Sequence, residues 1–261
     1  MSITREDHRI VIGMPWDTFL RHMRERWEPG QHIAMIGPTG EGKSTFAGGL
    51  LSLRRYVMAL DPKGEDETLS RTGYQRVTRM PTEIPWHERA LKSTAAARQW
   101  EQIHKDIAEG RGARIIVGAS TRTPAEDARN QALMREAIGY CRMAGGWTLY
   151  VDEHELLSSQ RMYHLGPPIE RMLNTARTLG TSVVTSYQAP AWVSHHATRQ
   201  ARFAVTWATG DRDMVKRIAS SMGRDWRQVA AAIDELPRYH ALVIPRGKNG
   251  GPLICTSAPK L

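Results

Sequence analysis

Short apolar runs alternate with longer polar or amphipathic segments over most of the chain. The apolar runs are Ile33–Ile36, Tyr56–Leu60, Arg114–Gly118, Thr148–Val151, Ser182–Thr185, Phe203–Trp207 and Ala241–Ile244. The segments with helical periodicity are Lys43–Leu53, Ser93–Glu109, Arg129–Ala144, Ile169–Leu179, Asp211–Ser221 and Trp226–Ile233. Apolar strands separated by helices are typical of a parallel sheet whose two faces are both covered. The pattern therefore predicts an α/β fold with a mostly parallel, twisted sheet and helices on both faces.

The regions at the margins of this alternation set the predicted domain boundaries. Residues 1–30 form a lead-in segment, with helical periodicity over Trp16–Trp27. Residues 64–100 begin with a charged, Thr-rich stretch and are expected to form loops or a small insertion. We see no linker long enough to divide the rest. We therefore expect a single domain over 31–261, which ends in strands over 240–261.

The segment Gly37–Ser44, with the sequence GPTGEGKS, fits the phosphate-binding loop G-x-x-x-x-G-K-[ST] at every fixed position. It follows a predicted strand and opens a predicted helix, which is the context that this loop requires. Its glycines let successive backbone N–H groups face phosphates. Lys43 is placed to reach the β- and γ-phosphates, and the Ser44 hydroxyl to bind Mg²⁺. The residues expected to bind the nucleotide are Gly37, Thr39, Gly40, Glu41, Gly42, Lys43, Ser44 and Thr45.

A second motif supplies what hydrolysis needs. The apolar strand Thr148–Val151 runs into Asp152 and Glu153. The Asp152 carboxylate can hold the Mg²⁺ water shell opposite Ser44. A carboxylate at Glu153 can polarise the water that attacks the γ-phosphate. Nucleotide kinases and most small GTPases do not need this second acid, so the pair favours an ATPase that performs work with ATP and Mg²⁺.

Two more segments fall at the ends of predicted strands. Asp61 and Lys63 follow the strand Tyr56–Leu60 and are expected at the carboxyl edge of the sheet, where ligands bind. Asp-Pro-Lys-Gly is also an ordinary turn sequence. Gln188 follows the strand that begins at Ser182. Its carboxamide can hydrogen-bond the γ-phosphate or the attacking water and report hydrolysis to the neighbouring loop.

An arginine near this strand is a candidate for transition-state stabilisation. Arg177 lies at the end of the preceding predicted helix and can reach a nucleotide held by an adjacent subunit. A guanidinium donated in this way neutralises the charge that develops during phosphoryl transfer. Arg171 is the competing candidate, and a solvated helix face is the ordinary alternative for either residue.

Charge and composition narrow the classes of partner and compartment. The formal net charge of +9 indicates a protein that tolerates or seeks polyanions. Nucleic acid is the first candidate, an anionic membrane surface is the second, and solubility alone is the plain alternative. Cys141 and Cys255 lie far apart and have no metal-ligand spacing, which favours a reducing compartment. No signal peptide or long apolar stretch is apparent, so we expect a soluble, cytoplasmic protein without a membrane span.

Taken in order, four elements resemble the FtsK–HerA superfamily of DNA-pumping ATPases. They are GPTGEGKS at 37–44, DPKGE at 61–65, the strand that ends in Asp152-Glu153, and the helix–Gly–strand–Gln segment at 176–188. This superfamily includes chromosome translocases, the coupling ATPases of conjugation and the packaging ATPases of some double-stranded DNA viruses. The resemblance implies a RecA-like core and a closed ring, usually a hexamer, with nucleotide between subunits and DNA in the pore. It implies the roles given above for Lys43, Ser44, Asp152, Glu153 and Gln188.

The sequence also departs from that pattern. Many relatives have Thr-Gln-Arg-Pro where this chain has Tyr187-Gln188-Ala189-Pro190. No membrane anchor like those of chromosome translocases and conjugative couplers is apparent. We therefore expect the compact branch of the superfamily, which includes viral genome packaging.

Contacts with DNA phosphates call for basic residues on short exposed segments. The candidates are Arg122 and Arg129 around one loop, Arg161 in the loop after Asp152-Glu153, and the turn Arg246-Gly247-Lys248 before a last strand. His195-His196 has no metal-spacing partner and is interpreted as a polar loop.

The sequence thus predicts a ring-forming ATPase, hexameric or pentameric, that couples hydrolysis of Mg-ATP to translocation of double-stranded DNA. A viral packaging enzyme would also need a portal or another recruiting protein. The alternatives are a conjugative or plasmid-type DNA-transfer ATPase, a P-loop kinase, and an ATP-dependent switch that does not act on DNA.

Overall fold

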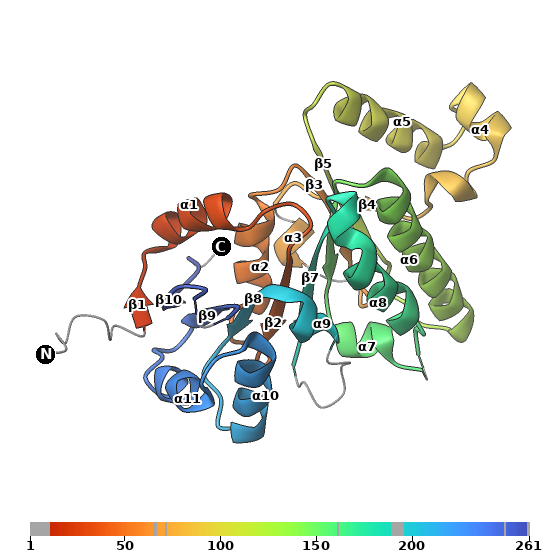
Figure 1. The fold of residues 1–261 in the computed structure, drawn as a ribbon. Coiled ribbons are helices and arrows are strands. Elements are labelled where there is room, and N and C mark those ends of the chain that lie inside the picture. The colour runs from red at the N-terminus through yellow and green to blue at the C-terminus, as the bar shows by residue number, and fades with distance from the viewer. Residues whose placement is uncertain are drawn as a thin grey trace, which may run out of the picture.

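The computed structural model describes residues 11–64, 67–70, 72–160, 162–188, 196–247 and 249–259. The strands in these residues form one ten-stranded sheet flanked by helices (Figure 1). The strands are β1 (Val11–Gly13), β2 (His32–Ile36), β3 (Tyr56–Leu60), β4 (Gln75–Val77), β5 (Ala113–Val117), β6 (Thr148–Val151), β7 (Ser182–Tyr187), β8 (Ala201–Thr206), β9 (Ala241–Pro245) and β10 (Leu253–Thr256). The α-helices are α1 (Trp16–Arg26), α2 (Lys43–Leu51), α3 (Glu67–Ser70), α4 (Trp86–Leu91), α5 (Ala95–Ala108), α6 (Pro124–Ala144), α7 (His154–Ser158), α8 (Gly166–Thr175), α9 (His196–Gln200), α10 (Arg212–Met222) and α11 (Trp226–Asp234), and the 3₁₀ helices are η1 (Pro81–Glu83) and η2 (Ala176–Leu179). None of these helices is long and apolar enough to cross a membrane.

The sheet is parallel over most of its width. The strand order is β1-β10-β9-β8-β2-β7-β6-β3-β5-β4. Neighbouring strands from β8 to β4 all run parallel, whereas β9 runs antiparallel to both β8 and β10. The predicted α/β fold with a mostly parallel sheet is therefore confirmed. Because the parallel strands share one direction, the loops that follow them meet at one edge of the sheet.

Each face of the sheet carries its own hydrophobic core. In β2, Ala34 and Ile36 belong to the core that α6, α8 and α10 cover, whereas Ile33 and Met35 belong to the core under α1 and α2. Successive side chains of a strand point to opposite faces. Since all five residues of β2 are buried, the strand needs cover on both sides. The continuous apolar run of this strand in the sequence has that cause.

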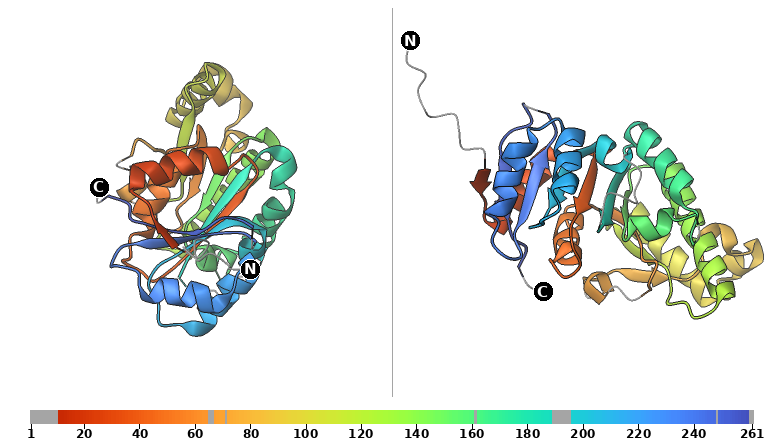
Figure 2. Two further views of the ribbon diagram at one scale, coloured as in Figure 1. Left: turned by 60° about the vertical axis from the view of Figure 1, so that its left-hand side comes forward. Right: turned by 90° about the horizontal axis from the view of Figure 1, so that it is seen from below.

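The segments at the margins of the sequence pattern also join this sheet. Phe19 of α1 packs against Phe46 of α2, with 5.5 Å between ring centroids, and β1 pairs with β10 in parallel. Within residues 64–100, β4 pairs with β5 and forms an edge strand. Figure 2 shows α4 and α5 at one end of the sheet and the C-terminal strands at the other.

Two predicted helices differ from the observed ones. The helix predicted at Arg129–Ala144 begins earlier, at Pro124. The Thr123 side chain accepts a hydrogen bond from the backbone N–H of Glu126, and the Glu126 carboxylate accepts one from Thr123 in return. Its first turns are polar, so apolar periodicity missed them. The helix predicted at Ile169–Leu179 is divided, because α8 passes into the tighter helix η2 for its last turn.

Candidate active site

The loop between β2 and α2 has the backbone geometry of a phosphate cradle. Gly40 and Gly42 have φ angles of 86° and 90°, in the left-handed region where a side chain would be strained. Gly42 precedes the first residue of α2, and no side chain caps this helix. The first N–H groups of the helix therefore stay available to an anion, which the helix dipole also favours.

Gly37 has a different task from the other glycines of this loop. Its N–H donates to the Tyr187 carbonyl oxygen at 3.2 Å, which joins the loop to the end of β7. A Cβ at this position would lie 2.9 Å from the Trp207 ring. Gly37 therefore lies beneath the loop, against the core, and lets the backbone approach Trp207 closely.

The Lys43 ammonium group bends back over its own loop. Its Nζ donates to the carbonyl oxygens of Gly37 and Pro38, both at 2.7 Å. Burial lowers the pKa of Lys43, while the nearby carboxylates of Asp152, Glu155, Glu153 and Glu41 oppose that shift. The amine is thus held at the mouth of the cradle, among negative groups, where phosphate oxygens can replace the two carbonyls.

A cavity of about 530 Å³ brings the predicted site residues together. Its walls come from the loops that follow β2, β3, β6 and β7, which are consecutive neighbours in the parallel part of the sheet. The lining residues are Thr39, Gly40, Gly42, Lys43, Ser44, Thr45, Asp61, Lys63, Asp152, Glu153, Ser186, Tyr187 and Gln188. Glu41 instead lines an adjoining cavity on the other side of the loop.

Asp152 and Ser44, the two residues predicted to bind Mg²⁺, both line this cavity. The Tyr150 hydroxyl donates to Asp152 Oδ1 at 2.9 Å and fixes the carboxylate at the end of β6. A carboxylate and a hydroxyl are hard oxygen ligands, which Mg²⁺ prefers, with phosphate and water completing its shell. Among the described residues there is no cluster of three acidic, histidine or cysteine side chains that would hold a metal without a nucleotide.

Glu153 is held in an unusual backbone conformation. Its φ and ψ angles are 47° and 53°, in the left-handed region that few non-glycine residues adopt. Its carboxylate Oε1 forms an ion pair with the Lys63 ammonium group, from the turn after β3. This hydrogen bond raises the pKa of Lys63. The sequence placed both residues at this edge but did not predict that they contact each other.

The tip of β7 is tied to the helix that follows Glu153. The backbone N–H of Gln188 donates to Glu155 Oε2 at 2.9 Å. Glu155 belongs to α7, so this contact joins the tip of β7 to the helix that follows β6. Sequence reasoning missed Glu155, because a second acidic residue two positions after Glu153 has no motif of its own.

Asp61 has a structural partner as well as a place in the cavity wall. It is 3% exposed, and its Oδ2 accepts from the Arg76 guanidinium at 2.9 Å. Its Oδ1 accepts from the backbone N–H of Gly64 at 3.0 Å, and Arg76 also donates to the Gly118 carbonyl oxygen at 2.6 Å. The carboxylate therefore closes the turn after β3 and fastens it to β4.

The two candidate arginine fingers lie away from this cavity. Arg177 is exposed in η2, which precedes β7, and its Cα lies 3.0 Å from the position that a Cβ on Gly30 would take. Gly30 in turn precedes β2. Arg177 is therefore at the amino edge of the sheet, opposite the cavity of its own chain. Arg171 is exposed on α8, the crossover between β6 and β7.

The predicted DNA-contacting residues have separate outcomes. Arg122 and Arg129 are exposed around the start of α6, and Arg129 lines a hollow of about 250 Å³ beside the end of β5. Arg161, Lys248 and His195 lie outside the described residues. The prediction for Arg246 is wrong, because its guanidinium points inward and donates to the carbonyl oxygens of Ala201, Ser221 and Thr198 at 2.6 to 2.8 Å. These carbonyls fasten the side chain to α9, α10 and β8.

A second cavity of about 420 Å³ adjoins the cradle on the side of β8 and β10. Gly40, Gly42 and Thr45 line both cavities. The second cavity is also lined by Tyr239, which is 40% exposed. The Arg238 guanidinium lies 4.7 Å from the centre of that ring. An aromatic face beside a phosphate cradle suits a nucleobase. No sequence motif indicates this cavity, since Tyr239 is almost 200 residues from the loop in the chain.

Comparison with known proteins bears on the fold. No family model and no curated protein matches the sequence. Among solved structures, the genome packaging NTPase B204 from Sulfolobus turreted icosahedral virus 2, in complex with AMPPCP, matches with a TM-score of 0.57 at 17% identity, over 89% of this chain and 100% of that chain. VirB4 of Thermoanaerobacter pseudethanolicus matches with a TM-score of 0.57 at 14% identity, over 88% of this chain and 89% of that chain. The bacterial conjugative coupling protein TrwB matches with a TM-score of 0.53 at 14% identity, over 94% of this chain and 92% of that chain.

These likenesses extend over nearly the whole of this chain and nearly the whole of each of the three proteins. Identities below one residue in five leave the fold as the shared property. The resemblance that the motifs indicate is thus confirmed at the level of the fold: this chain has the fold of the P-loop NTPases of viral genome packaging and of conjugation.

Proposed function

We propose that the protein is an ATPase that uses hydrolysis of Mg-ATP to move double-stranded DNA. The observation that carries the proposal is the convergence of the phosphate cradle, Asp152, Glu153 and Gln188 in one cavity at the carboxyl edge of the sheet. A kinase of small molecules would need no water-activating acid such as Glu153. The fold shared with B204, VirB4 and TrwB supports the same class of protein.

In this proposal, the chain's own residues divide the work of hydrolysis. Lys43 leaves the carbonyls of Gly37 and Pro38 and binds phosphate oxygens instead. Ser44 and Asp152 would hold Mg²⁺, which neutralises phosphate charge when it is bound. Glu153 accepts the proton of the attacking water. Lys63 forms its ion pair with Oε1 of Glu153, which would hold the carboxylate in place and leave Oε2 to accept the proton.

The same proposal assigns the outlying residues. Gln188 would contact the γ-phosphate or the water and transmit hydrolysis to α7 through Glu155. Tyr239 and Arg238 would hold the base. Because Arg177 lies at the amino edge of its own sheet, it can act only on a nucleotide held by a neighbouring subunit. A closed ring, hexameric or pentameric, would provide that neighbour, and a portal or another recruiting protein would bring the ring to DNA.

The test is steady-state ATP hydrolysis with and without long double-stranded DNA, at two salt concentrations. Stimulation by DNA that weakens as salt rises is the expected result, because phosphate contacts release counterions. If DNA does not change the rate of hydrolysis, the proposed movement of DNA is wrong, whereas the proposed ATP-binding and hydrolysis site is unaffected. A DNA-transfer ATPase of the conjugative type is the second candidate, supported by the 92% coverage of TrwB. Preference for single-stranded over double-stranded DNA would favour it.

A further inference from the structure

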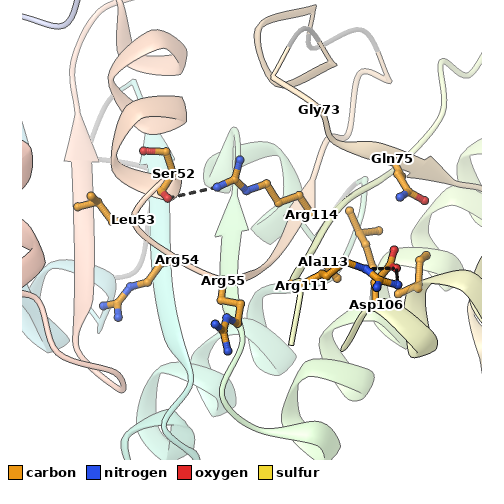
Figure 3. Close-up of a pocket in the computed structure, with 13 residues that line it drawn as sticks. Ser52, Leu53, Arg54, Arg55, Gly73, Gln75, Asp106, Arg111, Ala113 and Arg114 are labelled. Atoms are coloured by element: carbon orange, nitrogen blue, oxygen red, sulfur yellow. Dashed lines mark hydrogen bonds and ion pairs between the residues drawn. The ribbon is translucent and has the colours of Figure 1, made fainter. Parts of the chain in front are cut away.

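Another cavity, separate from the two beside the phosphate-binding loop, lies at the amino edge of the sheet. Its volume is about 540 Å³, and it lies where the chain enters β3, β4 and β5 (Figure 3). Four arginines line it, namely Arg54, Arg55, Arg111 and Arg114, and Asp106 is the one acidic side chain in the lining. The residues come from the turn after α2, the end of α5 and the turn after it, β5 and the region where β4 begins.

Two of the four arginines have partners within the fold. Arg54 donates to the carbonyl oxygens of Trp27 and Glu28 at 2.9 and 3.1 Å, and its guanidinium lies 3.8 Å from the centre of the Trp27 ring. Burial lowers its pKa to about 10. Arg111 is paired with the Asp106 carboxylate at 2.6 Å and with Glu109. Arg54 thus holds the lead-in segment in place, and the charge of Arg111 is matched.

The other two arginines keep donors for a ligand. In the described residues the Arg55 guanidinium is exposed and forms no hydrogen bond or ion pair. Arg114 uses one of its five N–H donors for the Ser52 carbonyl oxygen at 3.2 Å. Arg114 is paired in register with Val57, two residues after Arg55, so the β3–β5 pair places both residues on the wall of this cavity, where Figure 3 shows their side chains extending in different directions.

An ordinary role for arginines here is to cap helices. Both α2 and α5 end at this cavity, and their last carbonyls attract cations. This role accounts for Arg114 and Ser52, and for Arg54 beside the same turn. It does not account for Arg55, which faces the cavity without an acceptor from either helix.

We propose that this arginine-lined cavity binds phosphate groups of a nucleic-acid backbone. Guanidinium groups match phosphate oxygens with two parallel hydrogen bonds, and Arg55 and Arg114 line one cavity without an ion pair to a carboxylate among the described residues. The chain is strongly basic, with a formal charge of +9, as a polyanion partner requires. The inference rests on the proposed function and deepens it. It places a DNA contact at the edge of the sheet opposite the ATP site. DNA phosphates and ATP phosphates would therefore not compete for the same residues.

The experiment compares two matched double variants. Arg55→Ala with Arg114→Ala removes the unmatched pair. Arg142→Ala with Arg217→Ala removes two exposed arginines from α6 and α10, so this control has the same net charge as the cavity variant. Binding of a short fluorescent DNA duplex is measured by anisotropy between about 50 and about 200 mM salt. Inorganic tripolyphosphate is titrated separately as the free-phosphate probe.

The cavity variant is expected to bind the duplex roughly tenfold more weakly at low salt, and its slope of log affinity against log salt is expected to shrink by about two. The control pair should move the slope by less than half of that. Melting temperature and affinity for a fluorescent ATP analogue should stay at the wild-type values in both variants. If the double variant folds poorly, Arg55→Glu alone tests the cavity, because the Arg55 guanidinium forms no hydrogen bond or ion pair with the described residues.

Each other result overturns a different statement. If wild type binds duplex and the two double variants behave alike, the cavity is not a DNA contact and the proposed function stands. If only tripolyphosphate binding depends on Arg55 and Arg114, the ligand is a free phosphate compound, which overturns the nucleic-acid assignment. If wild type neither binds duplex nor is stimulated by it, the proposed action on DNA fails as well.

Discussion

The two edges of the sheet are built to meet phosphate in opposite ways. At the carboxyl edge, the cradle consists of backbone N–H groups shaped by Gly40 and Gly42, and Lys43 stands among several carboxylates. At the amino edge, the cavity is lined by arginine side chains of one sign, with a single acidic residue. A backbone cradle fixes distances and suits chemistry, whereas mobile side-chain charge suits contacts that are made and released. The difference is the basis on which we propose catalysis at the first edge and attraction of nucleic acid at the second.

The strongest test of this division is Glu153→Gln. Loss of the proton acceptor is expected to lower ATP turnover by about 100-fold to 10,000-fold, while ATP affinity stays close to wild type. Single-turnover hydrolysis and equilibrium binding of a fluorescent analogue measure the two quantities. Glu25→Gln on the exposed face of α1 is the control. Normal turnover in the Glu153 variant would make the base assignment wrong.

Lys43→Ala removes the cation from the carboxyl edge. We expect nucleotide affinity to fall by at least about 100-fold, because charge-assisted hydrogen bonds to phosphate contribute about 1.5–3 kcal/mol each. Binding of DNA without nucleotide should persist, since the arginines at the other edge are untouched. Loss of DNA binding in this variant would break the comparison. Lys105→Ala, an exposed lysine on α5, controls for the change in net charge.

His32 tests how acid affects the amino edge. Burial lowers its pKa to about 4; its Nδ1 accepts from the Val183 N–H at 3.0 Å, and its Nε2 contacts the Leu173 carbonyl oxygen at 3.1 Å. The unfolded chain binds this proton more readily, so stability is complete above the ordinary histidine pKa near 6.5. It is lost progressively as pH falls from about 6.5 toward about 4, by up to about 3 kcal/mol.

The measurement is the dependence of melting temperature on pH. We expect a clearly shallower acid limb in His32→Gln than in wild type, and an unchanged limb in His87→Gln, because His87 is exposed on α4. Parallel acid limbs in wild type and His32→Gln would show that this proton is not linked to folding.

The smallest expected effect comes from the cradle itself. Gly40→Ala places a side chain at a φ angle of 86° and should cost about 1–2 kcal/mol of folding stability, with weaker nucleotide binding. Gly139 lies within α6 with open space around it, so Gly139→Ala should be neutral or stabilising by up to about 1 kcal/mol. Chemical denaturation of both variants gives the difference. Equal stabilities would mean that the backbone geometry of the cradle is not what the first edge depends on.

The same contrast explains what the sequence could predict. The site residues at the carboxyl edge could be predicted from local motifs, because each lies within a few positions of the end of a strand. Residues of the amino edge, such as Arg55 and Arg114, are almost sixty positions apart and reach one cavity only through the pairing of β3 with β5. The prediction for Arg246 was wrong for a related reason. The carbonyl oxygens that bind its guanidinium come from distant segments, so the sequence does not distinguish it from an exposed basic turn residue. The polar first turns of α6 were missed because periodicity detects only apolar faces.

The left-handed backbone of Glu153 has a consequence for engineering. A non-glycine residue in this conformation costs about 1 kcal/mol or more, which glycine would not. Glu153→Gly should therefore give a more heat-resistant protein that no longer hydrolyses ATP. A search for stabilising substitutions that ignores activity would select this change early. At this position, folding stability and ATP turnover place opposite demands on the side chain. A stabilised version of this protein should therefore keep Glu153 and gain stability from substitutions at other positions.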